Sequence, residues 1–344
     1  MLEAGKSKPV TPQTLFLAAS TAKPIVAVAA LHYVENGALN LDSDVNLSLV
    51  SWRVPENEFT EKEKVTLRRL LSHNAGVTVE GFRGYALGEE VPGLIQILNG
   101  EWPANSDPIR VDIVPGTQHR YSGGGYMIVQ QLLEDAFGKS FPDILHDSVL
   151  EPWGMTTSTF ESPLPEQFHF KAAAGHRADG TTIPGGWHTC PEMGPGASMW
   201  ATSSDLAQFA IKVMQSYLGQ PDGVLSQNMA VEMLTPQIAN RGLGPVLLHD
   251  GDELFYFMHP VSDVTFRNRD SLFSGQSSIE DKRIALVKWI TCRCSGLAPI
   301  PSGPVPFDID QTFLKPLLPA EIGQHPHHHT DDHPPDHEIT PLPF

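Results

Sequence analysis

The sequence predicts an α+β fold. Segments with helical periodicity dominate the middle of the chain, whereas segments with strand character gather late in it. The chain has 344 residues, of which 40% are hydrophobic. It can therefore bury a core, and its length suits one large domain or two modest ones.

The first predicted helix follows a polar, turn-rich stretch over residues 1–14 and an apolar, strand-like lead-in over residues 15–19. Pro24 lies early in this helix, where its missing N–H does no harm, and Gly37 is expected to end it. The apolar face is supplied by Ile25, Val26, Val28, Ala29 and Leu31.

Two further helices are predicted in the first half of the chain. Residues 65–72 carry leucines at helical spacing, and residues 73–76 break that helix. Residues 77–115 are rich in loops, with short helical patches. Residues 126–137 read as an amphipathic helix that Gly138 ends.

The later segments supply the strands. Residues 203–205 are expected to cap a helix over residues 206–217. Residues 254–258 and 284–290 read as strands. Most of the predicted strands therefore follow the predicted helices along the chain, which favours the α+β class.

The composition predicts one folded domain over residues 1–295 and a tail over residues 296–344. Proline is dense in this tail and the hydrophobic periodicity is lost, so we predict a disordered segment. Loose metal binding by its histidines is the alternative reading. These histidines are His325, His327, His328, His329, His333 and His337.

The formal net charge of −17 disfavours nucleic-acid and anionic-membrane partners, because an acidic surface repels phosphate. No apolar run is long enough for a membrane span, and no signal peptide is recognised, although a start site placed too late would hide one. The cysteine spacing predicts neither a disulfide framework nor a zinc site, and it favours reduced thiols in the cytoplasm. The cysteines are Cys190, Cys292 and Cys294.

Ser20 and Lys23 are the first candidates for chemistry. Their spacing of three places both side chains on one face of a helix. A serine hydroxyl is a weak nucleophile until a neighbour takes its proton, and a lysine in a partly desolvated site has reason to be neutral and to act as that base. The start of the helix also places a positive dipole end near a developing oxyanion. A Ser-x-x-Lys pattern alone is common, so its context matters.

Tyr121, in Tyr121-Ser122-Gly123, is the second candidate. It follows a turn at residues 114–116 and precedes the helix over residues 126–137. A tyrosine there could relay protons between the nucleophile and the leaving group if a cation depresses its pKa, and Lys23 would be that cation. The alternative is an ordinary half-buried tyrosine.

The third candidate lies in residues 257–262. A strand beside the nucleophile can supply one oxyanion N–H, here from Ser262, while Ser20 supplies the other. His259 could bind the substrate on its carbonyl or carboxylate side. A histidine at a strand end with no role in binding is an equal alternative.

In this order the three elements resemble the serine β-lactamase and penicillin-binding-protein superfamily, whose motifs are SxxK, YxN or SxN, and KTG or HxG. The connecting segments resemble its class-C-like branch, which contains carboxypeptidases, β-lactamases and esterases. The resemblance covers residues 10 to 270 or so. Its segments are Pro12-Gln13-Thr14-Leu15-Phe16, Leu70-Leu71-Ser72-His73-Asn74-Ala75-Gly76-Val77, Val114-Pro115-Gly116, Glu151-Pro152-Trp153-Gly154-Met155 and Gly196 to Leu206.

This resemblance implies a β-lactamase/transpeptidase-like fold, with an antiparallel sheet flanked by helices and an all-helical region. It also implies that Ser20 is acylated, that Lys23 is the partner base and that Tyr121 is the general acid/base. His259 would take the place of the residue that opens the third motif, and the N–H groups of Ser20 and Ser262 would form the oxyanion hole. Ser72 and His73 match a segment that is structural in the family.

The sequence departs from the family pattern at three places. Only 19 residues precede Ser20, so the family's N-terminal strands are expected to be missing. Gly123 stands where YxN has its asparagine, at a position that contacts substrate. Val261 replaces the glycine of HxG, and Pro260 before it lacks an N–H.

These features predict a serine hydrolase that cleaves an ester or amide of a small molecule through an acyl-enzyme, without a metal or other cofactor. Ester cleavage is favoured over β-lactam cleavage because esters need less help with the leaving group. One alternative is a catalytically impaired binding or scaffold protein. Another is an acyltransferase to a small-molecule alcohol. The oligomeric state is not indicated.

Overall fold

The computed structural model describes residues 2–257 except residues 4, 178, 190–198, 222–223 and 251–252, with only the backbone at 248–250 and 253–257. Its strands form two small antiparallel sheets among the helices, which is the predicted α+β class. Contacts divide the chain into units Met1–Pro299 and Ile300–Phe344. The predicted domain boundary near residue 296 lies outside the described residues and stays a prediction. No helix in the described ranges is both long and apolar enough to cross a membrane.

The longer described helices are α1 (Lys23–Glu35), α4 (Gly123–Phe137) and α7 (Ser203–Tyr217). The shorter α-helices are α2 (Leu67–Leu71), α3 (Leu94–Asn99), α5 (Phe141–Leu145), α6 (Glu166–His169) and α8 (Gln227–Met233). The 3₁₀ turns are η1 (Ala19–Ala22) and η2 (Val45–Leu47), and η3 (His146–Leu150) is a π-helical turn. The strands are β1 (Phe16–Leu17), β2 (Trp200–Ala201), β3 (Val246–Asp250) and β4 (Glu253–Phe257).

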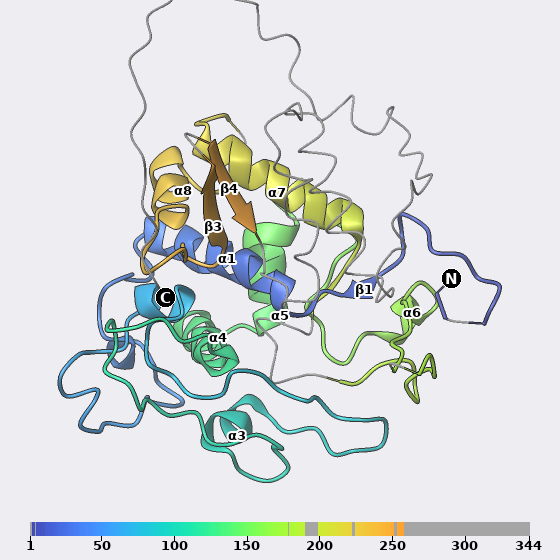
Figure 1. Cartoon of the computed structure of the whole chain (residues 1–344), viewed down its shortest axis with the longest axis horizontal. Coiled ribbons are helices and arrows are strands. Elements are labelled where there is room, and N and C mark those ends of the chain that lie inside the picture. The colour runs from blue at the N-terminus through green and yellow to red at the C-terminus, as the bar shows by residue number, and fades with distance from the viewer. Residues whose placement is uncertain are drawn as a thin grey trace, which may run out of the picture. The chain divides into compact units, whose positions relative to one another are not determined.

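Helix α1 is the central helix of the core. Its first nine residues are buried, because a helix that is apolar on nearly every side must be surrounded by protein. It contacts α4, α5 and η3. In Figure 1 it crosses the middle of the coloured chain, with α4 below it and α7 above it. As predicted, Pro24 lies in the first turn, and Gly37 follows the last turn with a left-handed φ of +76°.

Three predicted helices exist with different bounds. The segment predicted to begin at residue 126 begins at Gly123, because the Ser122 side chain accepts a hydrogen bond from the N–H of Gly125 and caps the helix there. The helix predicted to begin at residue 206 begins at Ser203, and its cap is Thr202. The helix predicted over residues 65–72 is the shorter α2.

The described strands form two short antiparallel pairs. Strand β1 pairs with β2, so Phe16 faces Ala201, and the N–H of Ala18 extends this contact to the carbonyl of Met199. Strands β3 and β4 form a hairpin in which Val246 faces Phe257. Strand β4 corresponds to the strand predicted over residues 254–258. The strand predicted over residues 284–290 lies outside the described residues.

Candidate active site

Ser20 lies at the junction of β1 and α1, in the short turn η1. The residue before it, Ala19, has a φ of +48°, a left-handed conformation that is strained for a residue with a Cβ. The N–H of Ser20 lies in the first turn of η1, where N–H groups have no acceptor within their own helix. The half-buried serine therefore offers both its hydroxyl and an N–H to a ligand.

The side chains of Ser20, Lys23 and Tyr121 meet. The Lys23 Nζ donates a hydrogen bond to the Ser20 Oγ over 3.0 Å, and the Tyr121 Oη donates another to the same oxygen over 2.8 Å. The Lys23 Nζ also lies 5.1 Å from the centre of the Tyr121 ring and 5.4 Å from that of Tyr126. Tyr121 comes from the end of the loop before α4, 101 residues further along the chain.

Lys23 is buried, with 2% of its surface exposed. Burial lowers its pKa from 10.5 to about 7, because an ammonium ion loses its hydration in apolar surroundings. No ion pair with a carboxylate restores that charge among the described residues. A large fraction of Lys23 is therefore a neutral amine at neutral pH, as the sequence predicted, and its lone pair can accept the serine proton across the 3.0 Å contact.

Tyr121 remains protonated at neutral pH. Burial raises its pKa, while the hydrogen bond to Ser20 and the charge of Arg241 lower it, and the charge of Glu80 raises it. The prediction that Lys23 lowers this pKa is wrong: the pKa of Tyr121 is raised, chiefly because burial disfavours a phenolate, and the charge that opposes this effect is that of Arg241. Tyr121 is therefore a proton donor in the resting site, and its cationic neighbour is Arg241.

His73 holds Tyr121 in place. Its Nδ1 lies 3.2 Å from the N–H of Ser122, and its carbonyl accepts a hydrogen bond from the N–H of Arg120 over 2.8 Å. The rings of His73 and Tyr121 lie 4.4 Å apart at 37°. His73 is buried and left-handed, with a φ of +59°. The sequence placed it in a structural segment, and here that structure clamps the residues on both sides of Tyr121.

The packing of a neighbouring loop explains why residue 123 is a glycine in this chain. The loop at residues 78–80 runs along the start of α4, so that the N–H of Gly123 donates to the carbonyl of Glu80 and the N–H of Gly124 donates to that of Val79. A Cβ at position 123 would lie 2.9 Å from the Glu80 carbonyl oxygen, and one at 124 would lie 2.7 Å from that of Thr78. The loop therefore occupies the space that an asparagine would need. The predicted substrate contact at Gly123 stays a prediction.

His259 and Ser262, the predicted third element, lie outside the described residues, as do Pro260 and Val261. The described chain therefore brings together the three candidates of the first two elements. The predicted contribution of the Ser262 N–H to the oxyanion hole therefore stays a prediction, whereas the N–H of Ser20 belongs to the described residues.

Sequence reasoning missed two residues near Tyr121. Arg241 is half-buried in the turn before β3, and its charge acts on Tyr121, Tyr126 and His119. His119 has a buried Nε2 without a hydrogen-bond partner among the described residues, and burial lowers its pKa. The position of His119 two residues before Tyr121 was an available signal. Arg241 had none, because only the tertiary fold brings its turn to the site.

One group of side chains in the described ranges has the spacing of metal ligands: His146, Asp147 and Glu151. All three are exposed, and the Asp147 carboxylate forms an ion pair with Lys139 over 2.9 Å. Because such clusters are common on surfaces, we assign no metal to it.

The chain matches the family model described as Beta-lactamase over residues 1–276. That match covers most of the chain, and the chain therefore belongs to the β-lactamase family. The order of its motifs and the meeting of Ser20, Lys23 and Tyr121 agree with this membership.

Its curated relatives include penicillin-binding proteins and esterases. The chain is 29% identical over 240 residues to penicillin-binding protein 4 of Amycolatopsis lactamdurans, which covers 68% of this chain and 60% of that protein. It is 32% identical over 177 residues to esterase EstB of Burkholderia gladioli, covering 48% and 43%. It is 25% identical to the lovastatin esterase of Penicillium rubens, covering 69% and 63%. The chain thus spans less than two thirds of each of these relatives.

Solved structures share the fold. A penicillin-binding protein from Bacillus halodurans matches with a TM-score of 0.54 and 20% identity, covering 74% of this chain and 75% of that one. EstCE1, a hydrolase with promiscuous acyltransferase activity, matches with a TM-score of 0.56 and 20% identity, covering 72% and 73%. At these identities the likeness concerns the fold, which is the β-lactamase/transpeptidase-like fold that the sequence predicted. The family thus includes hydrolases with several kinds of substrate.

Proposed function

We propose that this chain is a serine hydrolase that cleaves an ester or amide of a small molecule through an acyl-enzyme on Ser20. One observation carries the proposal: the Ser20 Oγ has a buried lysine at 3.0 Å and a tyrosine hydroxyl at 2.8 Å. The lysine can accept a proton and the tyrosine can give one. Both groups that acyl transfer needs therefore contact the same nucleophile.

In the acylation step, the neutral amine of Lys23 takes the proton of the Ser20 hydroxyl as the Oγ attacks the carbonyl carbon. The carbonyl oxygen becomes an oxyanion, which the N–H of Ser20 can stabilise. When the tetrahedral intermediate collapses, the bond to the leaving group breaks and Tyr121 gives its proton to that group. The proton held by Lys23 then returns to Tyr121.

Deacylation runs the same roles in reverse. Lys23 first takes the proton of Tyr121, and the Tyr121 phenolate accepts a proton from a water molecule as the water oxygen attacks the acyl carbon. The bond to the Ser20 Oγ then breaks, Lys23 gives its proton to that oxygen, the acid leaves, and the site returns to its resting state. No cofactor is needed for either step.

We favour an ester over a β-lactam as the substrate. An alcohol leaves more readily than an amine, so an ester needs less assistance. The third motif of this chain also carries Val261 in place of the family glycine, after Pro260, which lacks an N–H. The similarity to two esterases is in keeping with this choice. Transfer of the acyl group to an alcohol is a second candidate, because it uses the same acyl-enzyme and EstCE1 is described with that activity.

The test is covalent labelling. A fluorophosphonate probe should add one adduct to the wild-type chain in the intact mass spectrum, and Ser20→Ala should remove it. Ser204→Ala, at an exposed position on α7, is the matched control and should label like the wild type. A short-chain p-nitrophenyl ester should follow the same pattern in turnover.

Labelling that persists in Ser20→Ala would overturn the assignment of the nucleophile. A wild-type chain that neither labels nor forms an acyl adduct would favour a non-catalytic binding protein. Adding an alcohol acceptor and analysing the products separates transfer from hydrolysis.

A further inference from the structure

Arg241 lies in a turn that backbone hydrogen bonds fix against the core. The carbonyl of Arg241 accepts a hydrogen bond from the N–H of Gln237 over 2.7 Å, and three residues on, the N–H of Gly244 donates to the carbonyl of Leu71 over 3.1 Å. The hydroxyl of Tyr126 donates to that same carbonyl, also over 3.1 Å. The turn is therefore fixed against α2 and lies near the hydroxyl of Tyr126.

The close fit of Gly244 shows how tightly this turn meets the nucleophile's helix. Its φ is +107°, and a Cβ there would lie 2.8 Å from the Cβ of Ala27 and 3.1 Å from the Cα of Pro24. Pro24 is the neighbour of Lys23 in the first turn of α1. The turn that carries Arg241 is thus packed against the first turns of α1.

Arg241 carries a charge without a counterion among the described residues. Its Nε is buried and has no hydrogen-bond partner there. A guanidinium does not lose its proton at neutral pH, so burial cannot neutralise it as it neutralises a lysine. A half-buried cation held without an anion is costly, and such sites are often functional.

The groups around Arg241 are aromatic. Its charge acts on Tyr121 before α4, on Tyr126 within α4 and on His119. The further titratable groups near Tyr121 are Lys23 on α1, His73 after α2 and Glu80 in the loop against α4. Glu80 is the one carboxylate among them, and its side chain is exposed. The described cluster therefore lacks a buried anion in its resting state.

We propose that Arg241 stabilises the Tyr121 phenolate that forms when Tyr121 protonates the leaving group. This inference rests on the proposed function and adds a positioning and electrostatic role for one residue. In that step the Tyr121 O–H bond breaks, the proton goes to the leaving-group oxygen, and the phenoxide charge forms beside the guanidinium. The charge disappears when Lys23 returns its proton to Tyr121. Arg241 exchanges no proton.

The test compares two butyrate esters that share one acyl group. The ethoxide group of ethyl butyrate must receive a proton as it leaves, whereas p-nitrophenolate leaves without one. Arg241→Gln should lower kcat/KM about 30-fold for ethyl butyrate and less than about 3-fold for p-nitrophenyl butyrate. Position 241 is only half-buried, so in Arg241→Lys the ammonium group can reach water and stay charged, unlike that of the buried Lys23. Arg241→Lys should therefore keep most of the wild-type activity on ethyl butyrate, even if Arg241→Gln proves too unstable to assay.

Equal losses on the two esters in Arg241→Gln, or no recovery in Arg241→Lys, would overturn the inference. A selective rise in KM for the monoethyl ester of succinic acid would overturn it too, since Arg241 would then bind the substrate's carboxylate. The failure of the proposed function looks different: the wild type would not label at Ser20 and would cleave neither ester. In that case the role of Arg241 falls with it.

Discussion

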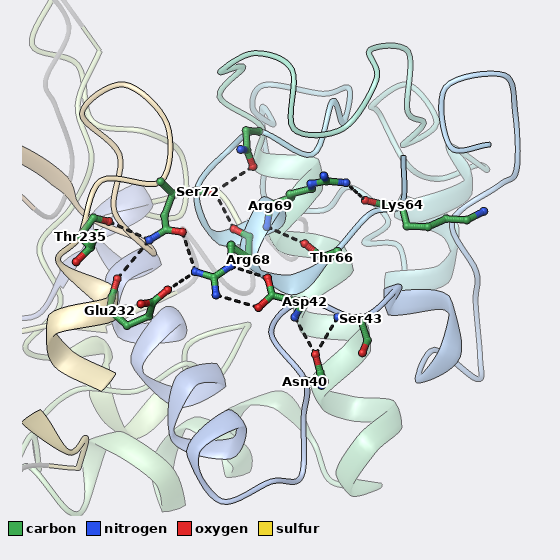
Figure 2. A network of polar contacts seen from close by, with 12 residues as sticks. Asn40, Asp42, Ser43, Lys64, Thr66, Arg68, Arg69, Ser72, Glu232 and Thr235 are labelled. Atoms are coloured by element: carbon green, nitrogen blue, oxygen red, sulfur yellow. Dashed lines mark hydrogen bonds and ion pairs between the residues drawn. The ribbon is translucent and has the colours of Figure 1, made fainter. Parts of the chain in front are cut away.

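Two buried or half-buried cations show how surroundings decide what a basic side chain does. Lys23 lies among apolar and aromatic groups, and its pKa falls to about 7. Arg68, on α2, donates to the Asp42 carboxylate at 2.6 Å and 2.9 Å and also pairs with Glu232, and these bonds raise its pKa. Figure 2 shows the Arg68 network, with Asp42 and Glu232 on either side of the guanidinium. A cation that pairs with carboxylates has a raised pKa and keeps its proton, whereas a buried lysine without a carboxylate partner can act as a base.

Gln237 connects the Arg68 network to the turn that carries Arg241. Arg68 also donates to the side chain of Gln237 over 2.8 Å, and the backbone N–H of Gln237 holds the turn that carries Arg241. Arg68 therefore has a structural role one step away from the candidate active site. The comparison separates a network of paired charges that stabilises the fold from a cluster in which Lys23 and Arg241 have no carboxylate partner among the described residues.

The largest effect expected is on Lys23. Lys23→Met should lower kcat/KM on a butyrate ester about a thousandfold, because the serine hydroxyl then lacks its base. Initial rates measure this, and Lys62→Met at an exposed position is the control. An active Lys23→Met variant would show that the buried lysine is not the base.

The same substitution should reveal the cost of burying the lysine. Because its pKa is lower in the folded state, the unfolded chain binds the proton between about pH 7 and the ordinary value of 10.5. The burial cost of wild-type Lys23 is therefore full below pH 7 and shrinks as the pH rises. Lys23→Met should gain stability relative to the wild type most at low pH, as urea unfolding at several pH values would show. A difference independent of pH would contradict the lowered pKa.

A middle-sized effect is expected at the start of α4. Gly123→Ala should destabilise the chain by about 1–3 kcal/mol, because its Cβ would meet the Glu80 carbonyl at 2.9 Å. Gly125→Ala is the matched control: its nearest atom lies at 3.6 Å, so stability should hold or rise by less than about 1 kcal/mol. Thermal unfolding compares them. Equal effects would mean that the loop does not require the glycine.

The smallest effect is expected in the Arg68 network. Arg68→Met should lower the free energy of unfolding by about 1–2 kcal/mol, since both of its carboxylate partners contact water and Asp42 is largely exposed. The exposed Arg53→Met should change it little. The pH dependence of activity should match that of the wild type. A shifted pH dependence in Arg68→Met would mean that the two cations are not independent.

The sequence predicted the parts of the site that depend on local spacing or on an ordered set of motifs. The pairing of Ser20 with Lys23 follows from a spacing of three, and Tyr121 followed from its place after the turn at residues 114–116. Two features were not predictable: the hydrogen bonds from Arg120 and Ser122 to His73, and the position of Arg241 near Tyr121. Both arise from contacts between segments that are distant in the sequence. The cation beside Tyr121 was misassigned because burial depends on the tertiary fold.

The central claim is that a buried, neutral Lys23 activates Ser20. The most direct test is the rate of fluorophosphonate labelling of Ser20 from about pH 5 to about pH 10. The rate should rise with pH, with a midpoint near the Lys23 pKa of about 7. A rate that is flat through neutral pH, or that rises only near the ordinary lysine value of 10.5, would contradict the claim.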